Sequence, residues 1–169
     1  MSSDIVYEKL DETVSVRGFI TASVMVFDEA VNGLINRVFR KTDFAVQSVV
    51  DSLFETSGPL SDLSIRLKVL VGLGIIEHRI FEDIHHFIDL KEQLNNDEKE
   101  HTFSAWIIIE FARQLHTLTN KEYLDFIEEE PSESLLYQMK KQRREKLIRS
   151  CLTLSVTDIY EQLNVDSPL

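Results

Sequence analysis

The sequence predicts an all-α protein, a single helical bundle of about six to seven helices joined by short loops. Apolar residues recur every three or four positions through most of the chain, and no segment shows the alternation of a β-strand. The chain has 169 residues, of which 43% are hydrophobic. This length supports one substantial core rather than two comfortable domains. We therefore predict one domain over residues 1–169.

The first long helix is predicted from about Val14 to Phe39, because its apolar residues recur at helical spacing. Asp43 can cap a second helix that continues through Phe54. Residues 1–12 carry little apolar pattern, and we predict a loosely attached N-terminal segment there.

A break and a third helix follow. Gly58-Pro59 interrupts the chain, since proline has no amide proton and biases the residue before it away from the helical region. Ser61 or Asp62 can cap the next helix. That helix is predicted to end near Gly72 or Gly74.

The second half of the chain predicts three more helical segments. Apolar periodicity indicates one helix at about 77–94 and another at about 103–118. Residues 128–132 combine carboxylates with a proline, so we predict an internal linker there. Ser132 or Ser134 can begin the last helix, which continues to about residue 163.

Composition limits the cellular setting. Residues 1–12 are polar and acidic, unlike a signal peptide. No apolar stretch is expected to reach the roughly 20 residues of a membrane span, because Arg66 and Lys68 interrupt the apolar run at 65–76. The single cysteine, Cys151, fits a reducing compartment. We expect a soluble, cytoplasmic protein.

The chain carries a formal net charge of −11, which opposes non-specific DNA binding unless cations gather on one face. They gather in a stretch that we call the basic segment, where Glu145 is the only acid. Its cations are Lys140, Lys141, Arg143, Arg144, Lys146 and Arg149. The segment could bind phosphates or an acidic partner surface, or it could be a solvent-exposed helix face that balances the acidic body.

The two helices around the Gly-x-Gly turn at 72–74 invite a helix-turn-helix interpretation. The second helix, however, carries Glu77, Glu82, Asp83, Asp89 and Glu92 against only two cations. That charge would repel a phosphate backbone, so a plain helical hairpin is favoured.

The same helix holds a weak candidate metal site. His78, Glu82 and His85 share one side at i, i+4 and i+7, and two imidazoles with a carboxylate can bind zinc or nickel. The HExxH arrangement is missing, and histidines on a solvated face explain the same residues. We expect no metal, no cofactor and no enzymatic activity, since the chain also lacks a phosphate-binding glycine loop and a serine-hydrolase motif.

Two motifs, at 38–46 (VFRKTDFAV) and 58–76 (GPLSDLSIRLKVLVGLGII), resemble the bacterial mannitol operon repressor family. The resemblance covers residues 14–95 well and extends more loosely through 137–163. It implies a cytoplasmic transcriptional regulator of mannitol or sugar-alcohol uptake genes. Members lack an evident DNA-binding module, so repression through a protein partner is implied. Partner-binding candidates are the basic segment, Arg66 and Lys68, although Arg66 could instead pair with Asp62.

The alternative is direct nucleic-acid binding, by the basic segment or by a degenerate pocket. The hairpin is also similar to helical HEPN-superfamily proteins, which use an arginine and a histidine for RNA cleavage or nucleotide binding. Arg79 and His85 match that spacing, whereas Lys91 stands where the motif has arginine. A homo-oligomer is also possible through the last helix.

Overall fold

The computed structural model describes residues 3–39, 62–125 and 133–164, and all regular secondary structure within these ranges is helical. The all-α prediction is confirmed for this part of the chain. The elements in order are α1 (Ser3–Asp11), α2 (Val16–Phe39), α4 (Leu63–Gly72), α5 (His78–Asn95), α6 (Trp106–Gln114), the 3₁₀ helix η1 (Lys121–Leu124) and α7 (Leu135–Leu163).

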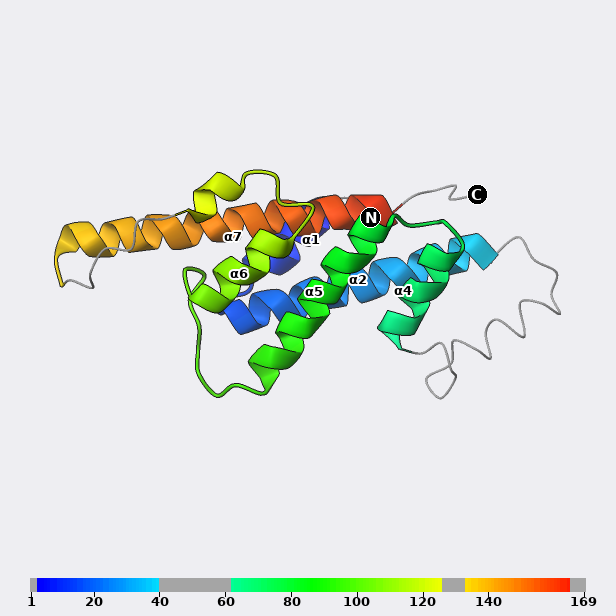
Figure 1. Ribbon diagram of the computed structural model, residues 1–169, viewed down its shortest axis with the longest axis horizontal. Helices are drawn as coiled ribbons and strands as arrows, with labels where there is room; N and C mark the ends of the chain where they lie inside the picture. The colour runs from blue at the N-terminus through cyan, green and yellow to red at the C-terminus, as the bar shows by residue number, and fades with distance from the viewer. Residues whose placement is uncertain (1–2, 40–61, 126–132, 165–169) are drawn as a thin grey trace.

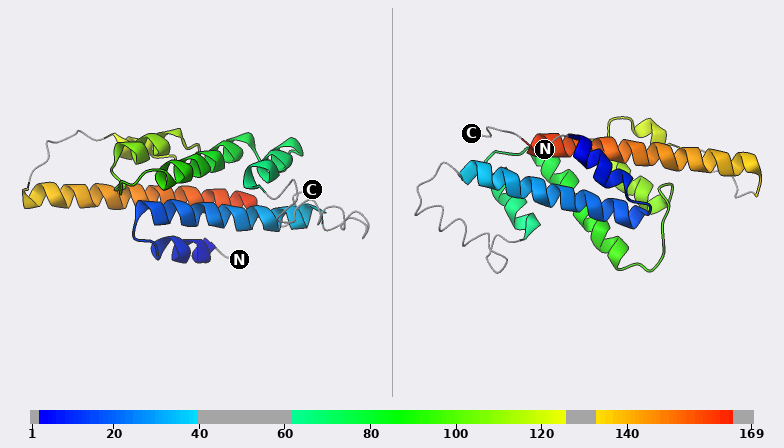
Figure 2. Two further views of the ribbon diagram at one scale, coloured as in Figure 1. Left: turned by 90° about the horizontal axis from the view of Figure 1, so that it is seen from below. Right: turned by 180° about the vertical axis from the view of Figure 1, so that it is seen from behind.

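Helix α2 lies at the centre of the bundle and packs against α1, α4, α5 and α7 (Figure 1). Its fully buried residues include Phe19, Ile20, Phe27, Val31 and Leu34, the stripe that the sequence periodicity predicts. Seen from below, α1 lies on one side of α2, and α4 and α5 lie on the other (Figure 2). The predicted boundaries of this helix agree with the structure to within two residues at its start.

The length and composition of α2 correct one expectation. Its segment Val16–Val38 is long and apolar enough to cross a membrane, with a mean hydropathy of 1.3. Half of this apolar stretch is buried inside the fold. Because four other helices cover α2, its apolar character is explained by its place in the core.

Helix α1 packs on α7 and α2, which differs from the predicted loose attachment of residues 1–12. Val6 and Leu10 are each only 1% exposed. They lie four residues apart, on one side of the helix. Two apolar residues are a weak periodic signal in a sequence, yet here both side chains are inserted into the core.

Helix α4 begins and ends where the sequence indicates. The Asp62 carboxylate accepts a hydrogen bond from the Ser64 amide at 2.7 Å, which caps the helix. The helix ends at Gly72, and Gly74 adopts a φ of 71°, a left-handed conformation that glycine accepts without strain. The predicted helix at 43–54 and the Gly58-Pro59 break lie outside the described residues.

Helix α6 spans 106–114, shorter than the predicted 103–118. The chain leaves the helix at Leu115, which has a ψ of 127°. The next two amides, of His116 and Thr117, donate to the Asp83 carboxylate at 2.8 and 2.9 Å. The buried Asp83 carboxylate of α5 therefore accepts hydrogen bonds from two amides that would otherwise bond to carbonyls within a longer α6.

Helix α7 is 29 residues long and begins after Ser134, whose hydroxyl accepts from the Tyr137 amide at 3.2 Å. The Ser134 cap agrees with one of the two predicted starts. The beginning of α7 extends beyond the other helices (Figure 1). Its first buried residue is Ile148, from which point the helix packs into the core. The predicted linker at 128–132 lies outside the described residues.

Candidate partner-binding site

The basic segment lies in the first half of α7 and ends where the helix enters the core. Lys140, Arg143 and Lys146 are exposed, whereas Lys141 and Arg144 are half-buried. The Glu145 carboxylate turns toward the start of α6 and accepts from the Ser104 hydroxyl at 3.2 Å. The outward side of this part of α7 therefore carries exposed cations.

Arg149 departs from the rest of the basic segment, because its side chain is directed into the fold. Its Nη2 donates to the Leu10 carbonyl at 2.9 Å and to the Thr13 carbonyl at 2.6 Å. The guanidinium carbon lies 5.7 Å from the Phe19 ring centroid and 5.5 Å from that of Phe103. Arg149 thus joins the α1–α2 corner to α7. Its guanidinium is used within the fold, so the prediction that Arg149 binds a partner is wrong.

We expect Arg149→Met to lower the free energy of unfolding by about 1–3 kcal/mol, because charged hydrogen bonds to two carbonyls are lost and the cation–π contacts with them. Urea denaturation followed by circular dichroism measures the change. The matched control is Lys146→Met, one turn earlier and exposed, which should change stability by less than about 0.5 kcal/mol. Equal effects of the two substitutions would contradict the assigned role.

A groove lies between α1 and α7, beside the basic segment. Its volume is about 620 Å³, and its walls include Tyr7, Glu8 and Asp11 from α1 and Lys146 and Leu154 from α7. Tyr7 is 40% exposed and Leu154 is 61% exposed. The groove thus combines apolar surface with both signs of charge.

Exposed apolar side chains continue from this groove along α7. We use the term outer face for the side of α7 that carries them, with residues at helical spacing. Its members are Leu135, Leu136, Met139, Lys140, Arg143, Lys146, Ser150 and Leu154. The cations of this face are evident from the sequence, whereas the groove is not, because the contribution of α1 depends on tertiary packing.

Arg66 and Lys68 have different positions on α4. Arg66 is buried, 6% exposed, and its guanidinium donates to the Asp28 carboxylate and to the Asn32 side-chain oxygen. The alternative pairing with Asp62 is also wrong, since that carboxylate caps α4. Arg66 therefore joins α4 to α2 and is not available to a partner, whereas Lys68 is exposed.

The predicted metal trio is not assembled in the structure. Glu82 accepts from His78 Nε2 at 2.8 Å and is 2.7 Å from His116 Nε2. His85 instead packs on Phe81, with 4.5 Å between ring centroids, and its Nε2 is buried without a hydrogen-bond partner. Among the described residues, no group of three or more side chains is arranged to hold a metal ion. Sequence reasoning missed His116, which reaches Glu82 from the turn after α6.

The contacts of Glu82 have a pH consequence. The hydrogen bond with His116 is the largest cause that lowers the Glu82 pKa from its ordinary 4.5, and the charges of His78 and His116 act in the same direction. A lowered folded-state pKa means that Glu82 contributes stability above its unfolded pKa and loses it as the pH falls through the folded value.

We therefore expect Glu82→Gln to destabilise the protein at pH 5.5, which lies above the ordinary Glu82 pKa of 4.5, so that the contribution of the carboxylate is present. The difference from wild type should disappear near pH 3, which thermal unfolding at the two pH values would measure. Glu92→Gln, an exposed change on the same helix, is the control. A difference that persisted undiminished at pH 3 would contradict this interpretation.

The HEPN-like pair is not arranged for RNA chemistry. Arg79 donates through Nε to the Glu77 carboxylate at 2.7 Å, which is the main cause of its raised pKa. The His85 Nε2 atom is buried. The Arg79 guanidinium is thus engaged with Glu77, and one of the two imidazole nitrogens of His85 is shielded from solvent.

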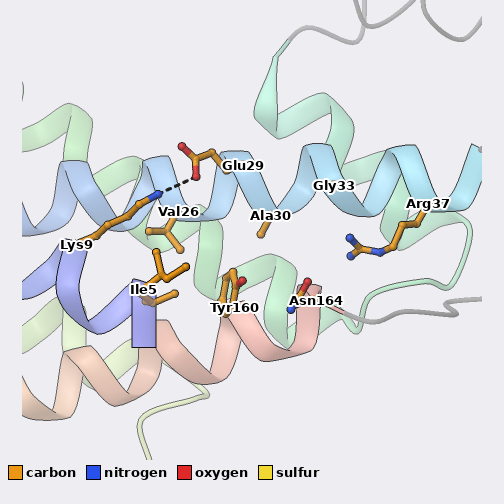
Figure 3. Close-up of a pocket in the computed structure, with 10 residues that line it drawn as sticks. Ile5, Lys9, Val26, Glu29, Ala30, Gly33, Arg37, Tyr160 and Asn164 are labelled. Atoms are coloured by element: carbon orange, nitrogen blue, oxygen red, sulfur yellow. Dashed lines mark hydrogen bonds and ion pairs between the residues drawn. The ribbon is translucent and has the colours of Figure 1, made fainter. Parts of the chain in front are cut away.

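A second, smaller cavity of about 230 Å³ lies between α2, α1 and the end of α7 (Figure 3). The Lys9–Glu29 ion pair, 3.0 Å long, is at one end. Arg37 and Asn164 are at the other end, and Ala30 and Tyr160 lie between the two ends (Figure 3). Arg37 also donates to the Leu163 carbonyl at 3.0 Å, so this cation helps to fix the end of α7.

The candidate recognition helix, α5, packs its apolar side against other elements. It packs against α2, α4, α6 and α7. Its buried residues are Ile80, Asp83, Ile84, Phe87, Leu90 and Leu94. A helix that enters a DNA major groove must present one side freely. The exposed side of α5 carries Asp89 and Glu92, and this acidic surface favours the plain hairpin over a helix-turn-helix.

Comparison with protein families decides the classification. The family model described as mannitol repressor, MtlR, matches residues 2–164. The chain belongs to the MtlR family. Similar curated proteins are the mannitol operon repressors of Escherichia coli strains K12 and O6:H1 CFT073. Each is 37% identical over 160 residues, which cover 95% of this chain and 81% of the relative. The family resemblance noted in the sequence is confirmed.

Solved structures agree with MtlR membership. The X-ray structure of the MtlR-HPr complex from Escherichia coli matches with a TM-score of 0.89 and 36% identity, covering 96% of this chain and 98% of that one. A possible transcriptional regulator, YggD from Shigella flexneri, matches with a TM-score of 0.78 at 24% identity over 97% and 98% of the two chains. The second match shows a shared fold only.

A more distant relative carries an enzyme name. Fumarase E of Shigella flexneri is 23% identical over 164 residues, which cover 96% of this chain and 97% of the relative. This identity is well below that of the MtlR relatives. The name describes that protein.

Proposed function

We propose that this MtlR-family protein is a cytoplasmic repressor of mannitol or sugar-alcohol uptake genes, and that it acts by binding a protein. The observation that carries the proposal is its likeness, over nearly the whole of both chains, to an MtlR that was solved in complex with HPr. We infer that HPr is a partner of this protein as well.

The fold supports regulation through protein contacts. In the ranges 3–39, 62–125 and 133–164, the only helix suggested for reading bases is α5, and its apolar side is buried by four neighbours. The net charge of −11 also opposes an approach to phosphates. We propose that the exposed cations of the basic segment, with Lys68, contact acidic protein surfaces rather than nucleic acid.

The surroundings of Cys151 disfavour it as a catalytic nucleophile. Its side chain is half-buried against the core, and desolvation raises the pKa of its thiol. A raised pKa disfavours the thiolate that a nucleophilic cysteine needs. Regulation by binding is therefore the function we propose, without a catalytic step.

Calorimetric titration of the purified protein with HPr tests the partner. We expect saturable binding with one HPr per chain, and no heat of binding with a heat-unfolded HPr control. A repressor–reporter assay in cells should lose repression when the gene is deleted and regain it on complementation. Absence of binding by folded protein would overturn HPr as the partner, and unchanged reporter expression would overturn the repressor role.

Binding to the promoter of the mannitol-uptake genes tests the alternative. The assay is run at two salt concentrations with scrambled DNA as the control. We expect equally weak binding to both DNAs. Specific, salt-sensitive binding to the promoter would instead favour DNA contact by the basic segment.

A further inference from the structure

We propose that a groove between α5 and α6 binds a basic segment of another protein, which places a lysine or arginine side chain beside Trp106. We call it the α5–α6 groove, and its volume is about 320 Å³. All of its lining residues belong to α5 and α6. The site is therefore separate from the basic segment on α7 and from Lys68 on α4, the cations to which the proposed function gives an acidic partner.

Two stripes of side chains at helical spacing form the walls of the α5–α6 groove. Helix α6 contributes Trp106, Glu110 and Gln114, and α5 contributes Asp89 and Gln93. Residues four apart lie on the same side of a helix. The two helices also pack against each other (Figure 1), so both stripes border one space. The rim of the groove consequently consists of carboxylates, amides and one indole.

The floor of the groove is apolar. Leu90 is 3% exposed and Phe111 is 6% exposed, and both line the groove together with the half-buried Ile107. Lysine and arginine side chains match this combination of floor and rim. Their alkyl parts can lie on apolar surface while the charged end remains in polar surroundings.

Trp106 supplies an aromatic contact at the first turn of α6. Its side chain is 68% exposed, so most of a large apolar surface faces solvent in the single chain. An indole face attracts a lysine or arginine cation that lies within about 6 Å of the ring. Tryptophan is also enriched among the residues that contribute most to protein–protein binding. The exposed indole therefore indicates a protein that covers it.

The charge of the groove determines the sign of its occupant. Asp89 is exposed and forms no ion pair among the described residues. Glu110 has a distant partner, Arg113 Nε at 3.7 Å, but that guanidinium lies closer to Asp125, at 2.9 Å. No lysine or arginine is among the described residues that line the groove, whose other ionisable side chain is the half-buried His86. A cationic segment is therefore complementary, whereas an acidic one is repelled.

The open form of the groove favours a protein segment over a small free cation. Asp89, Gln93, Trp106 and Gln114 are all exposed, so the rim does not enclose its contents. Sites for small molecules are clefts or cavities that bury most of the ligand. A basic segment of a protein can cover the whole rim and place one side chain on the floor. Nucleic acid is disfavoured by the same carboxylates.

Titration with a short synthetic peptide of alanine, leucine and lysine tests the proposal. Trp106 is the only tryptophan of the chain, so its emission reports directly on this groove. We expect the basic peptide to change the emission saturably, and a matched peptide with glutamate in place of lysine to leave it unchanged. Calorimetry then gives the affinity for each variant. Trp106→Ala should weaken binding at least about tenfold, as expected for a central aromatic contact.

Two double variants with the same net charge separate the groove from the general acidity of the protein. The groove variant is Asp89→Asn with Glu110→Gln, which should bind the basic peptide about tenfold more weakly because two ionic contacts are lost. The control variant is Glu92→Gln with Glu122→Gln, at exposed positions that do not line the groove. It should bind like wild type, and circular dichroism should show that all variants are folded.

Three results would overturn the proposal. The first is a Trp106 emission that the basic peptide leaves unchanged. The second is equal binding of the basic and acidic peptides. The third is equal weakening in the groove variant and the control variant, which would show that the peptide responds only to net charge.

Discussion

Phe87→Ala is expected to lower the free energy of unfolding by about 3–5 kcal/mol, the cost typical of removing a buried aromatic side chain. Phe87 has no exposed surface. Its ring makes edge-to-face contacts with Phe27 of α2, at 5.1 Å between centroids, and with Phe111 of α6, at 4.8 Å. The substitution would therefore open a cavity where three helices meet. Because domains have only about 5–15 kcal/mol of total stability, the loss is a large fraction.

Chemical denaturation of Phe87→Ala beside Phe81→Ala provides the measurement and its control. Phe81 lies on the same helix, six residues earlier, and is only partly buried, packing on His78 and His85. Its removal should cost about 1–2 kcal/mol, since transfer free energy scales with the apolar area that is buried. If Phe81→Ala cost as much as Phe87→Ala, the placement of the core at Phe87 would be wrong.

Asp83→Ala should lower the free energy of unfolding by about 3 kcal/mol, because buried donors that lose their acceptor remain unpaired. Asp83 is fully buried and accepts from the amides of His116 and Thr117. It also accepts from the Thr117 hydroxyl, at 2.8 Å, and that hydroxyl contacts the Ser155 hydroxyl. The carboxylate thus ties α5 to the turn after α6 and to α7.

Two further variants separate the role of Asp83 from general effects of charge. Asp89→Ala removes an exposed carboxylate from the same helix and should change stability by less than about 0.5 kcal/mol. Asp83→Asn keeps the volume but replaces one acceptor oxygen with a donor, so it should recover only part of the loss. Wild-type stability of Asp83→Ala in urea would refute the proposed network.

Local signals were sufficient for most of the helical framework. The apolar spacing within α2 predicts its extent, and the short polar residues Asp62 and Ser134 cap the helices that follow them. Each of these features depends on residues within one or two helical turns of one another. The same is true of the cations on the outer face of α7.

The roles of several charged side chains depend instead on contacts between residues distant in the sequence, which the periodicity of apolar residues does not encode. Arg66 is a cation that the sequence alone would place on the surface. It is buried in the fold because its guanidinium pairs with the carboxylate of Asp28, 38 positions away. Asp83 counted as surface charge on a candidate recognition helix, yet its partners lie beyond position 115. For the same reason the sequence did not reveal that Arg149 binds the carbonyls of residues 10 and 13.

Helix α7 combines two segments of unequal local stability in one continuous element. From Ile148 onward its turns are anchored by the core. Before that point, thirteen helical residues depend mainly on backbone hydrogen bonds and the Ser134 cap, and isolated helices of about this length are marginal in water. Amide protons of residues 138–146 should therefore exchange with deuterium much faster than those of residues 152–160. A molecule that covers the outer face would slow the exchange of residues 138–146. The exchange rate of this part of α7 therefore indicates whether a partner is bound there.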